Sequence, residues 1–476
     1  MRVVKRSGRT ACASALALLL AACAAVGPEY QRPALDLPAT FSNTGAAGTI
    51  AIPANWWTLY GDATLNGLVD AALAKNADIR FAVAKLDEAE AALREVDATL
   101  LPQVDLGGNT TRTRSSTLNA QPISASVPVL QKNQKLTAST NFELDFWGHL
   151  RRAAESARAQ LLSTSYARDV VGLTLAGSTA QVYFSLRSID AQIIVTRASL
   201  ATREESRKLV GSRARGGLAS DLDVNQAEAA RADAAVQLRD LLRQRLAYEH
   251  QLGALTGKLD LALSEGDLRR MPLPPLPPAG LPSTLLERRP DVRQAEQNLI
   301  AANAQIGVAK SAQLPTFSLT ASYGGSSETL GNLLAGGARI WSLGLGALMP
   351  VIDSGKYAAR TEQAEARQRQ SLARYQKSVE TAFRDVADAL SNVQQTTEAE
   401  RDVQARVEAA RKSLHLAKLR YAAGYSGYLE VLDTQRTAND AELALVRNRQ
   451  AGLSYSVDLM KSLGGGWVPD AATARR

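Results

Sequence analysis

The sequence predicts a mostly α-helical protein with a small β part, built from one structural unit that occurs twice. Three observations support this. Short strings recur at a nearly constant distance along the chain, each copy contains segments of period-two alternation, and each copy contains very long proline-free segments of helical composition. The chain has 476 residues, 45% of them hydrophobic and 21% charged, which disfavours a disordered protein.

The first 22 residues have the features of an export signal that is removed. Basic residues from Arg2 to Arg9 precede an apolar run at residues 11–20, which is too short to span a membrane as a helix. The run ends in Leu-Ala-Ala-Cys23, which resembles the lipobox of bacterial lipoproteins, where the cysteine is acylated. Cys12 would leave with the signal, so Cys23 would be the only thiol of the mature chain. Ala24 is not the aspartate that commonly signals retention at the inner membrane, so the resemblance implies a covalent lipid on Cys23 that anchors the chain in the outer membrane.

The formal charge of +8 is not a nucleic-acid signal. The basic residues of the leader (Arg2, Lys5, Arg6 and Arg9) account for half of it, which leaves +4 on the mature chain. The remaining charges of both signs are interleaved along predicted helices, which favours a solvated, salt-bridged surface and no nucleic-acid partner.

Two pairs of strings locate the duplication. ADIR at residues 77–80 corresponds to PDVR at 290–293, which lies 213 residues later. GLASDLDV at 217–224 corresponds to GYSGYLEV at 424–431, which lies 207 residues later. The first copy therefore has six additional residues between these strings, as a loop insertion would produce.

Each copy begins with a helix and continues with a strand hairpin. Residues 78–100 and 291–314 are rich in helix formers, and Pro102 and Pro315 then end the helical pattern. Alternation follows at residues 136–144, 317–323 and 341–349, with a fainter strand at 104–111 and polar loops at about 112–135 and 324–339.

Alternation over about ten residues is typical of a transmembrane β-barrel, although a half-buried soluble sheet has the same local pattern. The predicted outer-membrane anchor and the aromatic residues at strand ends, such as Trp147 and Trp341, favour the barrel. Four strands cannot close alone, so several chains must share one barrel: two would give a plugged barrel of eight strands, three would give twelve and four sixteen.

Long helical hairpins complete each copy. The intervals from Gly148 to Gly217 and from Gly355 to Gly424 are both 69 residues, about 100 Å of helix. Their apolar residues recur at spacings of three and four, which is coiled-coil spacing and requires packing partners. Glycine-rich turns end these helices, Ser220 or Asp221 is placed to cap the next one, and returning helices are expected at 222–256 and 429–463.

The predicted organisation is a signal peptide at 1–22, a lipidated extension at 23–62, a first repeat at 63–257 (strand hairpin 103–147, tip near 216–221), a proline-rich connector at 258–286, a second repeat at 287–463 (strand hairpin 316–352, tip near 423–428) and a tail at 464–476. Neither the three histidines nor GALTGK at 253–258 fits a metal or phosphate site, and GxSxG does not occur. We therefore expect no enzyme, no metal and no cofactor other than the lipid.

Four strings together resemble the TolC-like outer-membrane efflux proteins, in their NodT-type lipoprotein branch: GPEYQRP at 27–33, WWTLYGD at 56–62, LDFWG at 144–148 and ERRPDVR at 287–293. The resemblance implies a homotrimer with a twelve-stranded transmembrane β-barrel and a periplasmic α-barrel. It also implies an exit duct that passes small molecules such as drugs and toxic compounds, with a periplasmic adaptor (membrane fusion) protein and an inner-membrane RND-type transporter as partners.

The resemblance further implies which residues act. The adaptor contacts map to Gly217, Leu218, Ala219, Ser220, Gly424, Tyr425, Ser426 and Gly427. The periplasmic gate maps to Asp223, Glu430, Asp433 and Tyr421, although Ser426 stands where a gate arginine is frequent. A ring of acids would repel one another and attract cations, but acids near helix starts are also ordinary caps.

Two other functions account for part of the pattern. A periplasmic coiled-coil adaptor or scaffold lipoprotein without a channel would account for the helices and the lipid, but not for the strands. An exit duct for protein secretion would account for all the elements, since the sequence does not distinguish small-molecule from protein cargo.

Overall fold

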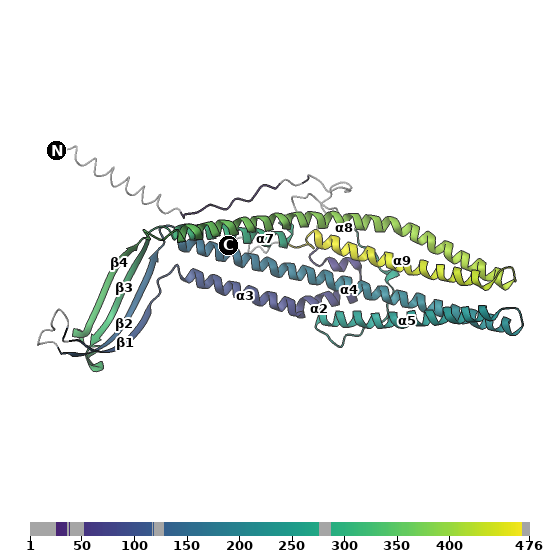
Figure 1. Ribbon diagram of the computed structural model, residues 1–476, viewed down its shortest axis with the longest axis horizontal. Helices are drawn as coiled ribbons and strands as arrows, with labels where there is room; N and C mark the ends of the chain where they lie inside the picture. The colour runs from purple at the N-terminus through teal and green to yellow at the C-terminus, as the bar shows by residue number, and fades with distance from the viewer. Residues whose placement is uncertain are drawn as a thin grey trace. The chain divides into compact units, whose positions relative to one another are not determined.

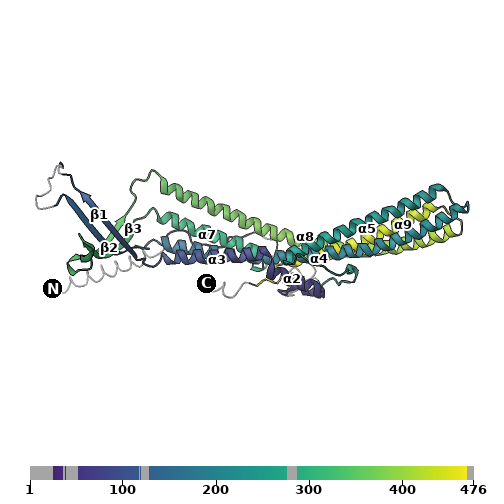
Figure 2. The ribbon, with the colours of Figure 1, turned by 90° about the horizontal axis from the view of Figure 1, so that it is seen from below.

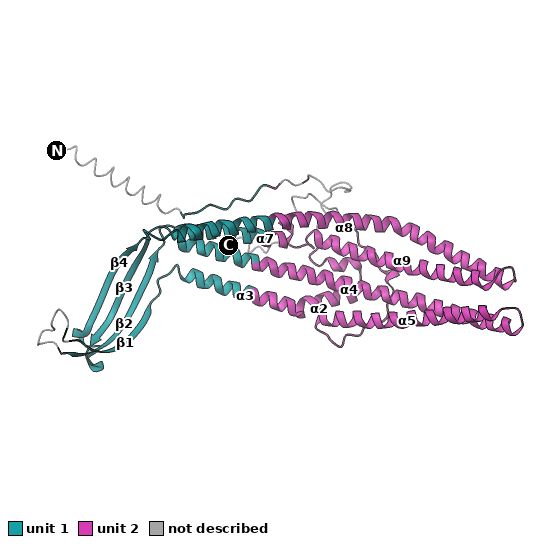
Figure 3. Cartoon of the chain, viewed as in Figure 1, with its two compact units in different colours: residues 1–34, 86–163, 295–375 teal, residues 35–85, 164–294, 376–476 magenta. Residues whose placement is uncertain are grey.

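The structure is a computed structural model that describes residues 25–35, 38, 52–116, 118, 128–275 and 287–468. The predicted signal peptide, Cys23, and parts of the extension, the connector and the tail lie outside the described residues. The chain divides into two compact units, coloured separately in Figure 3. Unit 1 comprises Met1–Ala34, Leu86–Ser163 and Ala295–Tyr375, and unit 2 comprises Leu35–Lys85, Thr164–Gln294 and Gln376–Arg476.

Helices and four strands follow one another in the predicted order (Figure 1). The elements are η1 (Trp56–Tyr60), α2 (Ala63–Lys75), α3 (Ala77–Ala98), β1 (Asp105–Arg114), β2 (Leu130–Leu144), α4 (His149–Arg215), α5 (Asp221–Thr256), η2 (Leu268–Arg270), α7 (Pro290–Ser311), β3 (Thr316–Ser327), η3 (Leu330–Asn332), η4 (Gly336–Ala338), β4 (Arg339–Leu348), α8 (Lys356–Ala422) and α9 (Tyr428–Ser462). Within the described residues, no helix combines the length and the apolar character needed to cross a membrane.

Unit 1 contains one antiparallel sheet in the order β1-β2-β3-β4. Its register brings the predicted apolar positions of neighbouring strands together: Phe142 of β2 lies opposite Leu319 of β3, which lies opposite Leu345 of β4. Tyr323 and Trp341 are also direct partners, and both side chains are mostly exposed in the single chain. The alternating residues of three strands therefore form one continuous apolar face.

The strands are longer than the alternation predicts, so the predicted loop bounds at 112–135 and 324–339 are wrong. β1 continues to Arg114 and β2 already starts at Leu130, with Thr111 paired to Asn133 and Thr113 to Gln131. These ends are polar on both faces, which removes the period-two signal. The ladder continues there because strand pairing depends on backbone hydrogen bonds rather than on apolar side chains.

The long helices form the two predicted hairpins, α4 with α5 and α8 with α9 (Figures 1 and 2). α4 and α8 each have 67 residues, and α5 and α9 have 36 and 35. The apolar residues at coiled-coil spacing are buried as predicted: Ile189 and Ile193 of α4 pack with Leu241 of α5, and Val407 of α8 packs with Ala438 of α9.

The main core of unit 2 is built around the WWTLYGD string. Trp56 and Tyr60 are fully buried in η1, and the ring of Tyr60 lies 4.9 Å from that of Phe184 in α4. Gly61 adopts a left-handed conformation (φ 65°) that ends η1, and Asp62 then caps α2 by accepting from the backbone amides of Thr64 and Leu65. Each residue of the string therefore has a structural reason to be there.

Candidate functional site

Both hairpins turn by the same backbone motif at their tips. Gly217 and Gly424 follow α4 and α8 in the left-handed conformation, with φ of 71° and 80°. The next amide bonds back to the carbonyl five residues earlier, from Leu218 to Arg213 (2.8 Å) and from Tyr425 to Arg420 (2.9 Å). This is the Schellman motif, which favours glycine because the left-handed conformation strains residues that carry a Cβ.

A capping box fixes Asp223 at the start of α5. The Ser220 hydroxyl accepts from the Asp223 amide (3.2 Å), and the Asp223 carboxylate accepts from the Ser220 amide (3.1 Å) and hydroxyl (2.9 Å). Ser220 rather than Asp221 is therefore the N-cap residue. The capping function stands beside the predicted gate function of Asp223 and does not exclude it.

The start of α9 has the same position occupied differently. Gly427 is its N-cap and offers no side chain to cap the helix. Glu430 instead pairs with Arg420 of α8 at 3.3 Å, and Asp433 lies 3.6 Å from Arg436 on its own helix. About two thirds of the Asp433 side chain is exposed, so it is the predicted gate acid with the most open surroundings in the single chain.

Tyr421, the predicted gate tyrosine, is 8% exposed in this chain. Its ring lies 5.7 Å from that of Tyr428 in a small cluster that also contains Val210 and Val431. Burial raises the pKa of Tyr428, so its hydroxyl stays neutral at physiological pH. The two tyrosines thus act here as the hydrophobic core of the tips.

The predicted adaptor contacts differ in exposure. Leu218 and Tyr425 project furthest, at 79% and 81% exposed, while Ala219 and Ser426 are only partly exposed. Exposed apolar side chains at two neighbouring turns are suited to contact with another protein.

Arg213 was not predicted as a site residue, yet it makes the most contacts between the two tips. Its guanidinium donates to the carbonyl oxygens of Tyr421 and Ala422, both at 2.8 Å, and lies 4.5 Å from the centre of the Tyr421 ring. The sequence signal that would have identified Arg213 is its equivalence to Arg420, 207 residues later.

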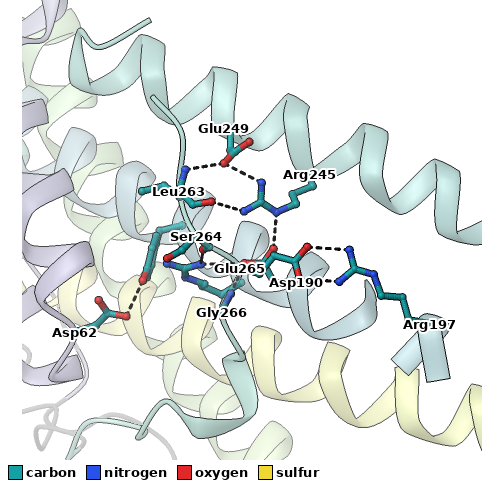
Figure 4. A network of polar contacts seen from close by, with 11 residues as sticks. Asp62, Asp190, Arg197, Arg245, Glu249, Leu263, Ser264, Glu265 and Gly266 are labelled. Carbon is teal, nitrogen blue, oxygen red and sulfur yellow. Dashed lines mark hydrogen bonds and ion pairs between the residues drawn. The ribbon is translucent and has the colours of Figure 1, made fainter. Parts of the chain in front are cut away.

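A buried polar network lies further along the same hairpin of unit 2 (Figure 4). Asp190 of α4 accepts from Arg187 (2.9 Å), from Arg245 of α5 (2.7 Å) and from the Gly266 amide (3.0 Å). The two arginines also donate to the carbonyl oxygens of the segment that follows α5, at Ser264 and Leu263. The network ties this segment to both helices.

The comparisons with known proteins follow this geometry closely. A family model described as outer membrane efflux protein matches residues 68–258 and 281–465. The chain belongs to the outer membrane efflux protein family.

Similar proteins align over almost their full length. The toluene efflux pump outer membrane protein TtgC of Pseudomonas putida is 33% identical, over 97% of this chain and 96% of TtgC. The outer membrane protein OprJ of Pseudomonas aeruginosa is 33% identical, over 95% of each chain. Among solved structures, the outer-membrane channel OprN has a TM-score of 0.86 at 29% identity, over 93% of this chain and 100% of OprN. The MtrE outer membrane channel of Neisseria gonorrhoeae has a TM-score of 0.83 at 29% identity, over 94% of this chain and 99% of MtrE.

This outer membrane efflux protein is therefore a channel component of an efflux system, located in the outer membrane and extending into the periplasm. The predicted family, fold class, function and localisation are confirmed, and a scaffold without a channel is not favoured. Its relatives are transport channels rather than enzymes.

Proposed function

We propose that this chain forms a lipid-anchored homotrimeric exit duct that receives small apolar compounds from a periplasmic adaptor and an inner-membrane RND-type transporter. The observation that carries the proposal is the sheet of unit 1. In the described residues, β1 and β4 each pair with one neighbour only, so the sheet has two open edges and an apolar face. Such a sheet is stable in a membrane only when further copies close it into a barrel, because unpaired edge groups are costly in lipid.

Three chains are the smallest number that leaves a water-filled passage, since eight strands from two chains enclose only side chains. The solution mass of the detergent-solubilised protein tests this stoichiometry. A protein mass of three chains supports the proposal, whereas a mass of one or two chains would contradict it.

Small apolar compounds are the favoured cargo because TtgC is named a toluene efflux pump protein and SrpC of Pseudomonas putida a solvent efflux pump protein. The remaining alternative is a duct for protein secretion. The test is to express the chain with an adaptor and an RND-type transporter in a host that lacks its own efflux channel. Restored tolerance to toluene supports the proposal, while secretion of a protein substrate without a gain in tolerance would favour the alternative.

The N-terminal segment of unit 1 supports a lipid on Cys23. The amide of Val26 donates to the carbonyl of Trp147, just after β2, at 2.9 Å. Glu29 pairs with the buried Arg152, and Arg32 makes a bidentate ion pair with Glu296 at 2.6 and 2.9 Å. Three residues reach about 10 Å at most. A lipid on Cys23 would therefore start near the end of a strand, where a barrel wall would leave the membrane.

Metabolic labelling with a clickable palmitate analogue tests this modification. The wild-type protein should carry the label and the Cys23→Ser variant should not. A labelled variant, or an unlabelled wild type of the expected mature mass, would contradict the lipid anchor.

The acids at the tips support a cation-attracting entrance. In a trimer, three copies of Asp223, Glu430 and Asp433 would lie around the axis, where their charges would repel one another and attract cations. We expect the variant with Asn, Gln and Asn at these positions to conduct more in a planar bilayer at neutral pH and to lose block by trivalent cations. Unchanged conductance and unchanged block would assign the acids to helix capping alone.

A further inference from the structure

Arg213 joins the ends of two helices that belong to different hairpins. It lies in the last turn of α4, and its two donated hydrogen bonds end on the carbonyls of Tyr421 and Ala422 in the last turn of α8. Its guanidinium also stacks on the Tyr421 ring. These contacts join the last turn of one hairpin's long helix to the last turn of the other's.

The chemistry of this contact suits arginine in particular. The last carbonyls of a helix have no partner within the helix and carry the negative end of its dipole. A guanidinium offers two parallel donors in a rigid fork and a flat face for an aromatic ring, whereas a lysine ammonium offers a single point of charge. One side chain thus caps α8 and stacks on it at the same time.

The duplication explains why Arg213 is available for this contact. Arg420, its equivalent in the second copy, pairs with Glu430 of its own hairpin. Asp223, the equivalent of Glu430, is already engaged by the hydroxyl and amide of Ser220. Gly427 replaces Ser220 in the second copy and has no hydroxyl. The same two positions therefore form a pair within the second hairpin and leave the arginine of the first hairpin to reach across.

We propose that Arg213 is a latch that holds the turn of the second hairpin against the first and keeps the periplasmic entrance narrow. The inference rests on the proposed trimeric duct with its entrance at the tips. If the end of α8 moves away from the end of α4, both hydrogen bonds and the ring contact are lost together. Release of this one side chain is therefore a required step when the second hairpin turns outward.

The test compares single-channel conductance of purified variants in planar bilayers. Arg213→Met keeps much of the side-chain volume without the fork, and Arg213→Lys keeps the charge. Arg215→Met is the matched control, because Arg215 bonds the Ser212 hydroxyl of its own helix at 3.0 Å. We expect at least a threefold rise in conductance for Arg213→Met, a smaller rise for Arg213→Lys, and wild-type conductance for Arg215→Met.

The outcomes separate the latch from the duct. A wild-type trimer that forms channels which Arg213→Met leaves unchanged would overturn the latch alone. A wild-type protein that inserts without forming channels would overturn the duct and the latch with it. Equal rises in the Arg213 and Arg215 variants would assign the effect to general loosening of the tips and would also overturn the latch.

A cross-link distinguishes a released latch from a misfolded tip. The full-length sequence contains only Cys12 and Cys23, so an Arg213→Cys, Ala422→Cys double variant introduces a nearly unique thiol pair into the mature chain. The reduced variant should conduct like Arg213→Met, and a short, cleavable bifunctional thiol reagent should return it to the wild-type level. Conductance that stays high after complete cross-linking would overturn the proposal.

Discussion

Replacing Asp190 with asparagine removes one charge from the buried network of unit 2 and keeps the shape of the side chain. The Asp190 side chain is fully buried, and those of Arg187 and Arg245 are 8% and 12% exposed. An asparagine oxygen still accepts from the Gly266 amide, so the backbone contact is retained. The variant therefore isolates the charge of Asp190 from its volume.

The size of the effect follows from the partners that remain. Removing one member of a buried ion pair costs about 3 to 5 kcal/mol, because the other charge stays buried without compensation. Glu249 still pairs with Arg245 at 2.9 Å, so Arg187 is the main group left without a counter-charge. We therefore expect the lower end, about 3 kcal/mol. With an unfolding entropy of about 2.1 cal/mol/K per residue, this corresponds to about 3 °C for a chain of this length.

The assay is thermal unfolding of the detergent-solubilised protein, followed by circular dichroism at one scan rate. Asp240→Asn is the matched control, since Asp240 forms a similar pair with Arg243 of α5 in which both side chains are well exposed. Such exposed pairs contribute little to stability, so the control should melt with the wild type. If Asp190→Asn also melts within about 1 °C of the wild type, the network does not depend on the charge and the reasoning is refuted.

Two further predictions concern other positions. A Cβ on Gly307 would lie 2.6 Å from the Val26 carbonyl oxygen, so Gly307→Ala should release the N-terminal segment and expose it to limited proteolysis. Gly331→Ala, in open space, should resist cleavage like the wild type, and equal resistance of both variants would refute the contact. Burial raises the pKa of Asp458, so its ionised form is less favoured in the folded state than in the unfolded state, and the resulting loss of stability appears as pH rises above the ordinary range near 4. Asp458→Asn should therefore raise the melting temperature at pH 7 but not at pH 3.5, and a gain of equal size at both pH values would exclude this cause.

The sequence predicts the helical hairpins well because their signals are long and redundant. The glycines at 217 and 424 mark both turns, and the helices end within two residues of them. The strand ends were predicted less well. Around Asn133 and Gln134 both faces of β2 are polar, so the ladder there leaves no pattern in the side chains. Periodicity reports burial and chemical contrast between two faces, and it fails where a paired strand has neither.

The tips show a different limit of sequence reasoning, because equivalent positions of the two copies have different partners. Asp223 and Glu430 align, but a single difference at the helix cap, Ser220 against Gly427, gives them different contacts. The capping box of the first hairpin stabilises the start of α5 by about 1 kcal/mol.

The Arg420–Glu430 pair of the second hairpin is half exposed and therefore screened by water. The second turn is thus held less firmly by its own residues than the first. The contacts of Arg213 compensate for this from the neighbouring hairpin. An asymmetry between two copies of one unit makes the second hairpin the one whose position depends on a separable contact, and so the one whose movement a single side chain is able to control.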